Sequence, residues 1–152
     1  MTTWAAFAAA EPELAAFAAK RLRSELPSYL ATVQANGAPR VHPVTPIFTA
    51  EGLYLFMEPT SPKGRDLRER TRFALHSGVP DHQGTGGEVW VTGTGHPDDD
   101  PGVRQAVTAA SGYSPLDRYV VFELRPTEVR AFGYDDITLP EHPRWRDSAA
   151  SR

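Results

Sequence analysis

Apolar residues in the first 26 positions recur at spacings near three, four and seven, the period of one helical face. The residues that set this period are Trp4, Phe7, Leu14, Phe17 and Leu22. Alanine, which favours helix, fills much of the remainder. Pro12 either begins a second helix in its first turn or kinks one longer helix. We therefore expect a helical N-terminal extension over residues 3–26.

From Tyr29 onward the period changes to two, which is typical of β-strands. Asn36-Gly37 is a strong hairpin signal, and Glu51-Gly52 predicts a second turn. Three strands joined by tight turns are expected over residues 29–35, 39–49 and 53–57, as an antiparallel meander. The second of these contains three prolines, which cannot donate to a β-ladder. Part of that strand must therefore lie at a sheet edge or at a bulge.

The rest of the chain alternates short helices with strands. Ser61 is a good N-cap and Pro62 suits a first helical position, while three aspartates at 98–100 suit a helix entry. Helices are predicted over 61–70 and 102–110, and strands over 73–77, 88–94, 117–124 and 127–132. The pattern is that of a mainly β fold with inserted helices, a six- to seven-stranded antiparallel β-barrel over residues 27–134. Residues 135–152 are polar and proline-broken, and we expect a loose tail.

Composition limits the class of protein. A chain of 152 residues is expected to form one domain, residues 1–152, and has no cysteine for disulfides, thiolate chemistry or iron–sulfur clusters. A net charge of −3 and a pI near 5.9 argue against nucleic acid as a partner. We found no apolar run of ~20 residues and no signal-peptide pattern. The expectation is a cytoplasmic protein without a membrane partner.

The segment from Thr60 to Leu67 carries the most chemistry. A helix start offers unpaired N–H groups and the positive end of the helix dipole, which together favour phosphate. Residues that would add to such a site are Ser61, Lys63, Gly64 and Arg65. The alternative interpretation is a capped surface helix whose arginines are solvated or steer an anionic ligand.

A second candidate lies in the strand 39–49. Strand alternation places Arg40, His42 and Val44 on one face and Val41, Pro43 and Thr45 on the other. The face with Arg40 and His42 is either the wall of a polar pocket or simply a face in contact with solvent.

Other kinds of site have little support. None of the five histidines shows the spacing of a metal-binding helix, so no metal site is predicted, although Asp81-His82 is a weak candidate. There is no GxSxG motif of a serine hydrolase. The glycines at 84, 86 and 87 precede a strand, which does not fit a dinucleotide-binding or P-loop motif.

The order of these segments resembles the pyridoxamine 5′-phosphate oxidase-like superfamily of FMN-binding split barrels. The resemblance covers roughly residues 27–132 and rests on the succession of three strands followed by a helix with Ser61 and Lys63 in its first turn. This superfamily includes the flavin/deazaflavin-dependent oxidoreductases.

The resemblance implies a set of cofactor-binding residues. Phosphate ligands would be Arg40 and Lys63, with Ser61 beside them. Residues lining the isoalloxazine ring would be Val41, His42, Thr45, Phe56, Met57 and Glu88. Pro62 stands where the oxidase usually has arginine, so one phosphate contact must come from elsewhere, with Arg65 as the candidate.

The resemblance also implies an activity. The expected cofactor is FMN, with coenzyme F420 as the alternative, and the reaction is hydride transfer to or from a small organic substrate. His42 is the best candidate for proton delivery, and a homodimer with the cofactor at its interface is expected. The oxidase's C-terminal substrate motif is absent, which argues against oxidation of pyridoxamine phosphate itself. Alternatives are a non-catalytic binder of flavin, haem or another tetrapyrrole, and a structural or regulatory dimer.

Overall fold

The computed structural model describes residues 2–134 and 137–151. In this part of the chain the helices are α1 (Trp4–Ala10), α2 (Pro12–Leu22), α3 (Pro62–Arg70), α4 (Pro101–Ser111) and a short 3-10 helix, η1 (Ser148–Ser151). The strands are β1 (Ser28–Val33), β2 (Pro39–Val44), β3 (Ile47–Phe48), β4 (Leu53–Met57), β5 (Arg72–His76), β6 (Glu88–Asp98), β7 (Val120–Phe132) and β8 (Arg144–Arg146).

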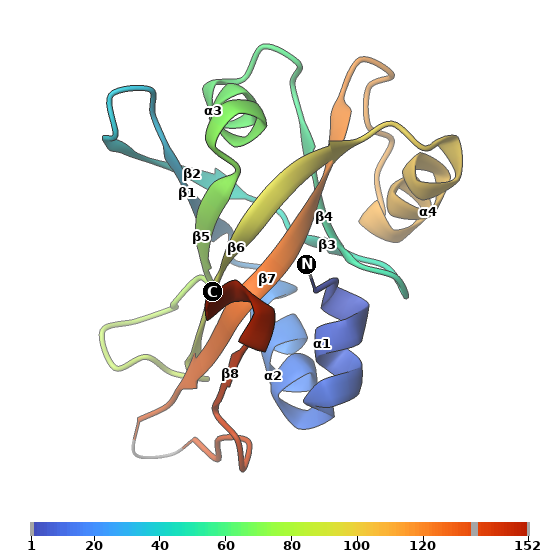
Figure 1. Ribbon diagram of the computed structural model, residues 1–152. Coiled ribbons are helices and arrows are strands. Elements are labelled where there is room, and N and C mark those ends of the chain that lie inside the picture. The colour runs from blue at the N-terminus through green and yellow to red at the C-terminus, as the bar shows by residue number, and fades with distance from the viewer. Residues whose placement is uncertain (1, 135–136, 152) are drawn as a thin grey trace.

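All eight described strands belong to one antiparallel sheet, in the order β2-β1-β5-β6-β7-β4-β3, with β8 added beside β7. The sheet curls, with α3 across its upper end, α1 and α2 at its lower end and α4 at its side (Figure 1). The structure thus confirms a mainly β fold with inserted helices, and the architecture is a split β-barrel.

The expected meander of three strands is wrong. Residues 39–49 form two strands rather than one, and these lie at opposite edges of the sheet. β2 pairs with β1, whereas β3 pairs with β4. The break falls at Thr45 and Pro46, where proline lacks the N–H that a continued ladder needs. This short connection carries the chain from one edge strand of the sheet to the other.

The two strands predicted over 117–124 and 127–132 are one strand, β7, which begins at Val120. Pro126 did not end the strand, because it lies where the pairing of β6 with β7 shifts register, beside Gly93. Along its other side β7 pairs with β4 at its start and with β8 further on. β7 is therefore the strand that joins both halves of the sheet.

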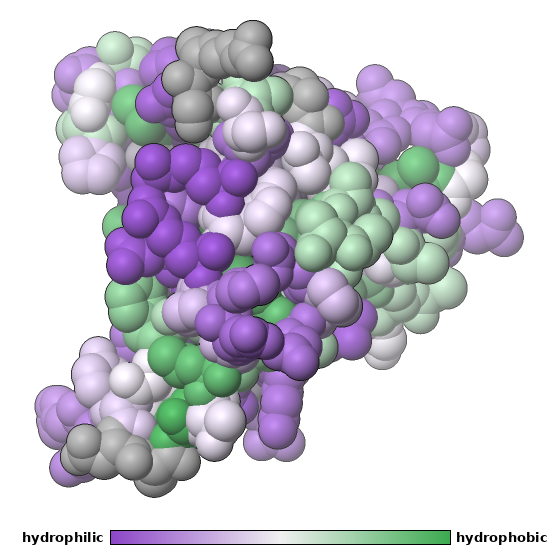
Figure 2. All heavy atoms as spheres, turned by 60° about the horizontal axis from the view of Figure 1, so that its bottom comes forward, coloured by the Kyte–Doolittle hydropathy of each residue, from purple (hydrophilic) through white to green (hydrophobic). Residues whose placement is uncertain are grey.

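The N-terminal helices complete the core at the lower end of the barrel. Pro12 is the first residue of α2, so the segment forms two helices rather than one kinked helix. Trp4 meets Phe7 and Phe48 edge-to-face, with ring centroids 5.0 and 5.1 Å apart. Figure 2, which brings this end forward, shows apolar patches beside hydrophilic ones on the surface. Among the described helices, none is long and apolar enough to span a membrane.

The segment expected to be a loose tail is largely ordered. Residues 135, 136 and 152 lie outside the described part, but β8 pairs with β7, and Trp145 packs against Phe7 at 4.9 Å. The buried carboxylate of Asp147 accepts a hydrogen bond from Thr2 Oγ1 at 2.6 Å. The C-terminal segment thus ties the first helix to the sheet.

The bulge at Gly93 yields a test of the fold. A Cβ on Gly93 would overlap the main-chain carbonyl of Arg125, which cannot move without breaking the ladder. We predict that Gly93→Ala lowers the free energy of unfolding by about 3 kcal/mol, at the upper end of overpacking effects.

The matched control is Gly37→Ala, since Gly37 has positive φ but open space around it. Its expected loss is only the conformational penalty of about 1 kcal/mol. Urea denaturation of both variants measures the difference, and equal losses would contradict the proposed overlap.

Candidate functional site

The first turn of α3 has a main-chain N–H group that is available to a ligand. Ser61 caps the helix as predicted, because its Oγ accepts the N–H of Gly64 at 3.2 Å. The N–H of Arg65 bonds to the Ser61 carbonyl, and Pro62 has none to offer. The N–H of Lys63 donates to no group in the described residues. One main-chain donor therefore remains free at the positive end of a nine-residue helix.

The Lys63 side chain is half-buried beside this N–H. Its ammonium group makes no ion pair or hydrogen bond with any described residue, and burial lowers its pKa. A half-buried ammonium without a counter-charge is unfavourable, and an incoming anion would relieve this cost. Lys63 is therefore the strongest candidate for binding an anion among the predicted residues.

Arg40 is held against the same helix. On β2 it points to the inner side with His42 and Val44, where Val44 enters the core. Arg40 Nε donates to Oδ2 of Asp66, in the second turn of α3, at 2.8 Å. The face with Arg40 and His42 is thus not a simple solvent face, because α3 covers part of it.

Asp66 was missed by the sequence analysis, although it is the centre of this polar cluster. Its side chain is only 3% exposed, and Oδ2 also accepts the hydroxyl of Thr32 at 2.8 Å. Arg70 Nη2 lies 3.5 Å from Oδ1. Burial alone would raise the pKa of Asp66, but hydrogen bonds from Arg40 and Thr32 and the charges of Arg40 and Arg70 outweigh it and lower the pKa. The only local signal was the i, i+4 spacing of Asp66 and Arg70.

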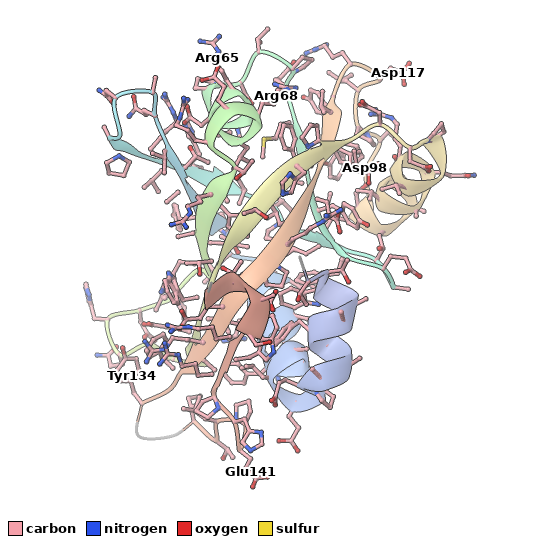
Figure 3. The ribbon with its side chains drawn as sticks, in the orientation of Figure 1. Arg65, Arg68, Asp98, Asp117, Tyr134 and Glu141 are labelled. Carbon is pink, nitrogen blue, oxygen red and sulfur yellow. The ribbon has the colours of Figure 1, made fainter. Side chains whose placement is uncertain are left out.

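Other predicted residues lie around β2. Val41 is 60% exposed on the outer side, and Thr45 is exposed just past the strand end. Arg65 is exposed and points up and away from the barrel (Figure 3), with no contact to Arg40 or Asp66. Because β2 is an edge strand, one side of its backbone has no strand partner within the described residues. Main-chain groups on that edge are therefore available to a ligand.

The pair at the end of β4 has other partners in this chain. Met57 is buried in the core, with its sulfur close to Gly64. The Phe56 ring lies 6.2 Å from that of Tyr113 and under the guanidinium of Arg104 at 5.5 Å. Phe56 therefore packs toward α4 rather than toward Arg40.

Glu88 lies at the other end of the sheet. Its carboxylate is 3.7 Å from Nε2 of His76, and His76 Nδ1 is 2.7 Å from the carbonyl of Ser77. α3 meets β6 at Gly95, whose N–H bonds to Thr71 at 2.8 Å. Gly95 follows Glu88 by seven positions along β6, a distance of roughly 20 Å in a strand. One chain therefore does not bring Glu88 to the α3 end of the site.

The outer face of the sheet is hollowed. A groove of about 590 Å³ crosses β1, β5 and β6, with Pro39 of β2 at one side and Ala150 at the other. Small residues such as Ala31 and Ala74 form its floor. None of the four α-helices lines it. Among the described residues, no three His, Cys, Asp or Glu side chains are grouped so that they could hold a metal ion.

The architecture defines a split-barrel protein with a candidate anion site at the start of α3. The chain belongs to the pyridoxamine 5′-phosphate oxidase family, whose model matches residues 13–133. A comparison with curated proteins finds no match.

Several solved structures share the fold. They include a haem-binding protein from Mycobacterium smegmatis (20% identity, TM-score 0.66, 88% of this chain and 57% of that one). Others are HutZ, the haem storage protein from Vibrio cholerae (19%, 0.57, 76% and 94%), and a NimC/NimA family protein from Clostridium acetobutylicum (22%, 0.65, 79% and 85%). This chain thus spans little more than half of the mycobacterial protein.

The lowered pKa of Asp66 predicts a pH dependence of stability. A carboxyl group whose pKa is lower folded than unfolded stabilises the fold above its unfolded value of ~3.9, and this contribution is lost as pH falls through the folded value. Asp66→Asn should therefore be less stable than wild type at pH 7, with the difference shrinking below about pH 4. Urea denaturation at pH 7, 5, 4 and 3 measures it, and a constant difference would refute the ionised pair.

Proposed function

We propose that this protein is a cytoplasmic oxidoreductase that holds FMN, with its phosphate at the start of α3 and its ring along the edge of β2. The observation that carries the proposal is the half-buried, unpaired ammonium of Lys63 next to a free helix N–H. Membership of the pyridoxamine 5′-phosphate oxidase family supports the flavin. Coenzyme F420, which also carries a phosphate, is the alternative cofactor.

The residues present suit a phosphorylated flavin. Lys63 supplies a point charge, the helix start an N–H, and Arg40 a guanidinium whose terminal amino groups face no described partner. Bound FMN would accept or donate the hydride, so the protein needs to orient the ring and exclude water. His42, half-buried on the inner side of β2, is the candidate for moving a proton to or from a small-molecule substrate.

The test compares two lysines. Lys63→Ala should weaken FMN binding at least tenfold, which corresponds to loss of a charged hydrogen bond, while riboflavin binding changes little. Lys20→Ala is the control, because Lys20 lies on the helix α2, away from α3. Fluorescence titration measures both ligands. Equal loss for FMN and riboflavin, or none, would contradict a phosphate site at Lys63.

Haem binding is a second candidate function, in line with two of the structural neighbours. The observation in its favour is His76, 42% exposed on the sheet surface. A proton donated from Nδ1 to the Ser77 carbonyl leaves Nε2 with the lone pair that binds iron. If hemin titration gives a Soret band that His76→Ala abolishes, and neither FMN nor F420 binds, haem replaces flavin as the ligand.

We further propose a homodimer in which a second copy covers the outer face of the sheet. Tyr29 and Val41 are 46% and 60% exposed there, and the groove floor consists of small residues. Exposed apolar area of this kind on a sheet face is typical of an interface. A two-fold axis makes the same patch serve both copies.

Ala74→Arg tests this interface, because Ala74 lies in the groove floor. Light scattering should give twice 16.7 kDa for the wild type and 16.7 kDa for the variant. Ala110→Arg, on the exposed side of α4, should remain dimeric. A monomeric wild type at micromolar concentration would exclude the dimer.

A further inference from the structure

Asp66 divides its contacts between two arginines in an unequal way. Oδ2 accepts Nε of Arg40 and the hydroxyl of Thr32, both at 2.8 Å, whereas Oδ1 faces Arg70 at 3.5 Å. The carboxylate thus joins α3, β1 and β2 at one buried point.

The two guanidinium groups differ in what remains free. Arg70 donates Nε to the Val33 carbonyl at 2.7 Å and Nη1 to Glu69 at 2.7 Å, and its Nη2 faces Asp66. Arg40 uses only Nε, and its two Nη groups bond to no described residue. A guanidinium fixed through Nε presents its other two amino groups as a fork suited to a phosphate. Arg70 therefore uses its donors within the protein, on Val33, Glu69 and Asp66, while the two Nη groups of Arg40 stay available to a ligand.

The position of Asp66 on α3 relates this fork to the anion-binding turn. Asp66 follows Lys63 by three residues, so both lie within two turns of the same helix. Arg40 comes from β2, and its only described contact with the helix is through Asp66. Without that contact, a 27%-exposed arginine on an edge strand would be free to turn toward solvent.

We propose that Asp66 is a positioning residue that holds Arg40 at the α3 corner so that its Nη groups bind the phosphate of the cofactor. The inference rests on the proposed function, since it concerns the same phosphate. The charge of Asp66 does not repel the anion, because Arg40 and Arg70 neutralise it and Thr32 donates to it.

The experiment measures the affinity of the full-length protein for FMN and for riboflavin, which lacks the phosphate. Asp66→Ala should weaken FMN binding about tenfold and leave riboflavin nearly unchanged. Asp66→Asn, which keeps an oxygen for Arg40 Nε, should shift the ratio in the same direction by less. In an Arg40→Ala background, Asp66→Asn should have no further effect, as expected if Asp66 acts through Arg40.

One control separates positioning from simple stabilisation. Glu69→Gln removes an exposed carboxylate on the same helix and leaves every bond to Asp66 in place. This variant should retain the wild-type ratio of FMN to riboflavin affinity.

Three results would overturn the inference. Equal weakening of both ligands in Asp66→Asn would make Asp66 purely structural. Unchanged or tighter FMN binding in that variant would mean that Asp66 competes with the phosphate for Arg40. A wild-type protein that binds FMN no better than riboflavin would overturn the phosphate site itself, and with it the proposed function.

Discussion

The buried ion pair of Asp66 with Arg40 is the contact on which the α3 corner depends. β2 is an edge strand with one strand neighbour among the described residues, and apart from that ladder and Val44 in the core, this side-chain bond attaches it to α3. A carboxylate only 3% exposed is unfavourable unless its lone pairs are used, and Thr32, Arg40 and Arg70 use them. Removing one charged partner would leave the buried carboxylate with less compensation, which destabilises the corner.

Much of the fold follows from local signals. The Asn-Gly turn, the Ser61 cap and Pro12 at a helix start act through neighbouring residues, and the structure confirms them. The errors concern long-range pairing. Prolines in 39–49 indicated an edge or bulge, but no local pattern shows that β2 and β3 belong to opposite edges. Pro126 read as a strand end because its bulge partner, Gly93, lies far away in sequence.

The residues of the candidate site also fall into two groups, those that a local sequence signal identifies and those that depend on long-range contacts. Lys63 and Ser61 were found from helix-start chemistry, since cap, dipole and charge lie within one turn. Arg40 was placed on a polar strand face by alternation and was given its phosphate role by the resemblance, whereas its contact with α3 depends on a residue 26 positions away. Asp66 and Thr32, separated by 34 positions, had no sequence signal that linked them. Asp66 read as one of many charges on a solvated helix, and only the tertiary structure shows that it is buried.

The separation of Glu88 from the α3 end bears on the assembly. Within one chain the two groups of predicted cofactor residues lie roughly 20 Å apart along β6, so a single subunit offers two partial sites. In a two-fold dimer, residue i of one copy meets residue j of the other and the reverse. If the axis passes through the middle of the outer groove, the Glu88 end of one copy lies toward the α3 end of its partner. The separation is consistent with our proposal of a homodimer, in which residues of both copies would contribute to one cofactor site.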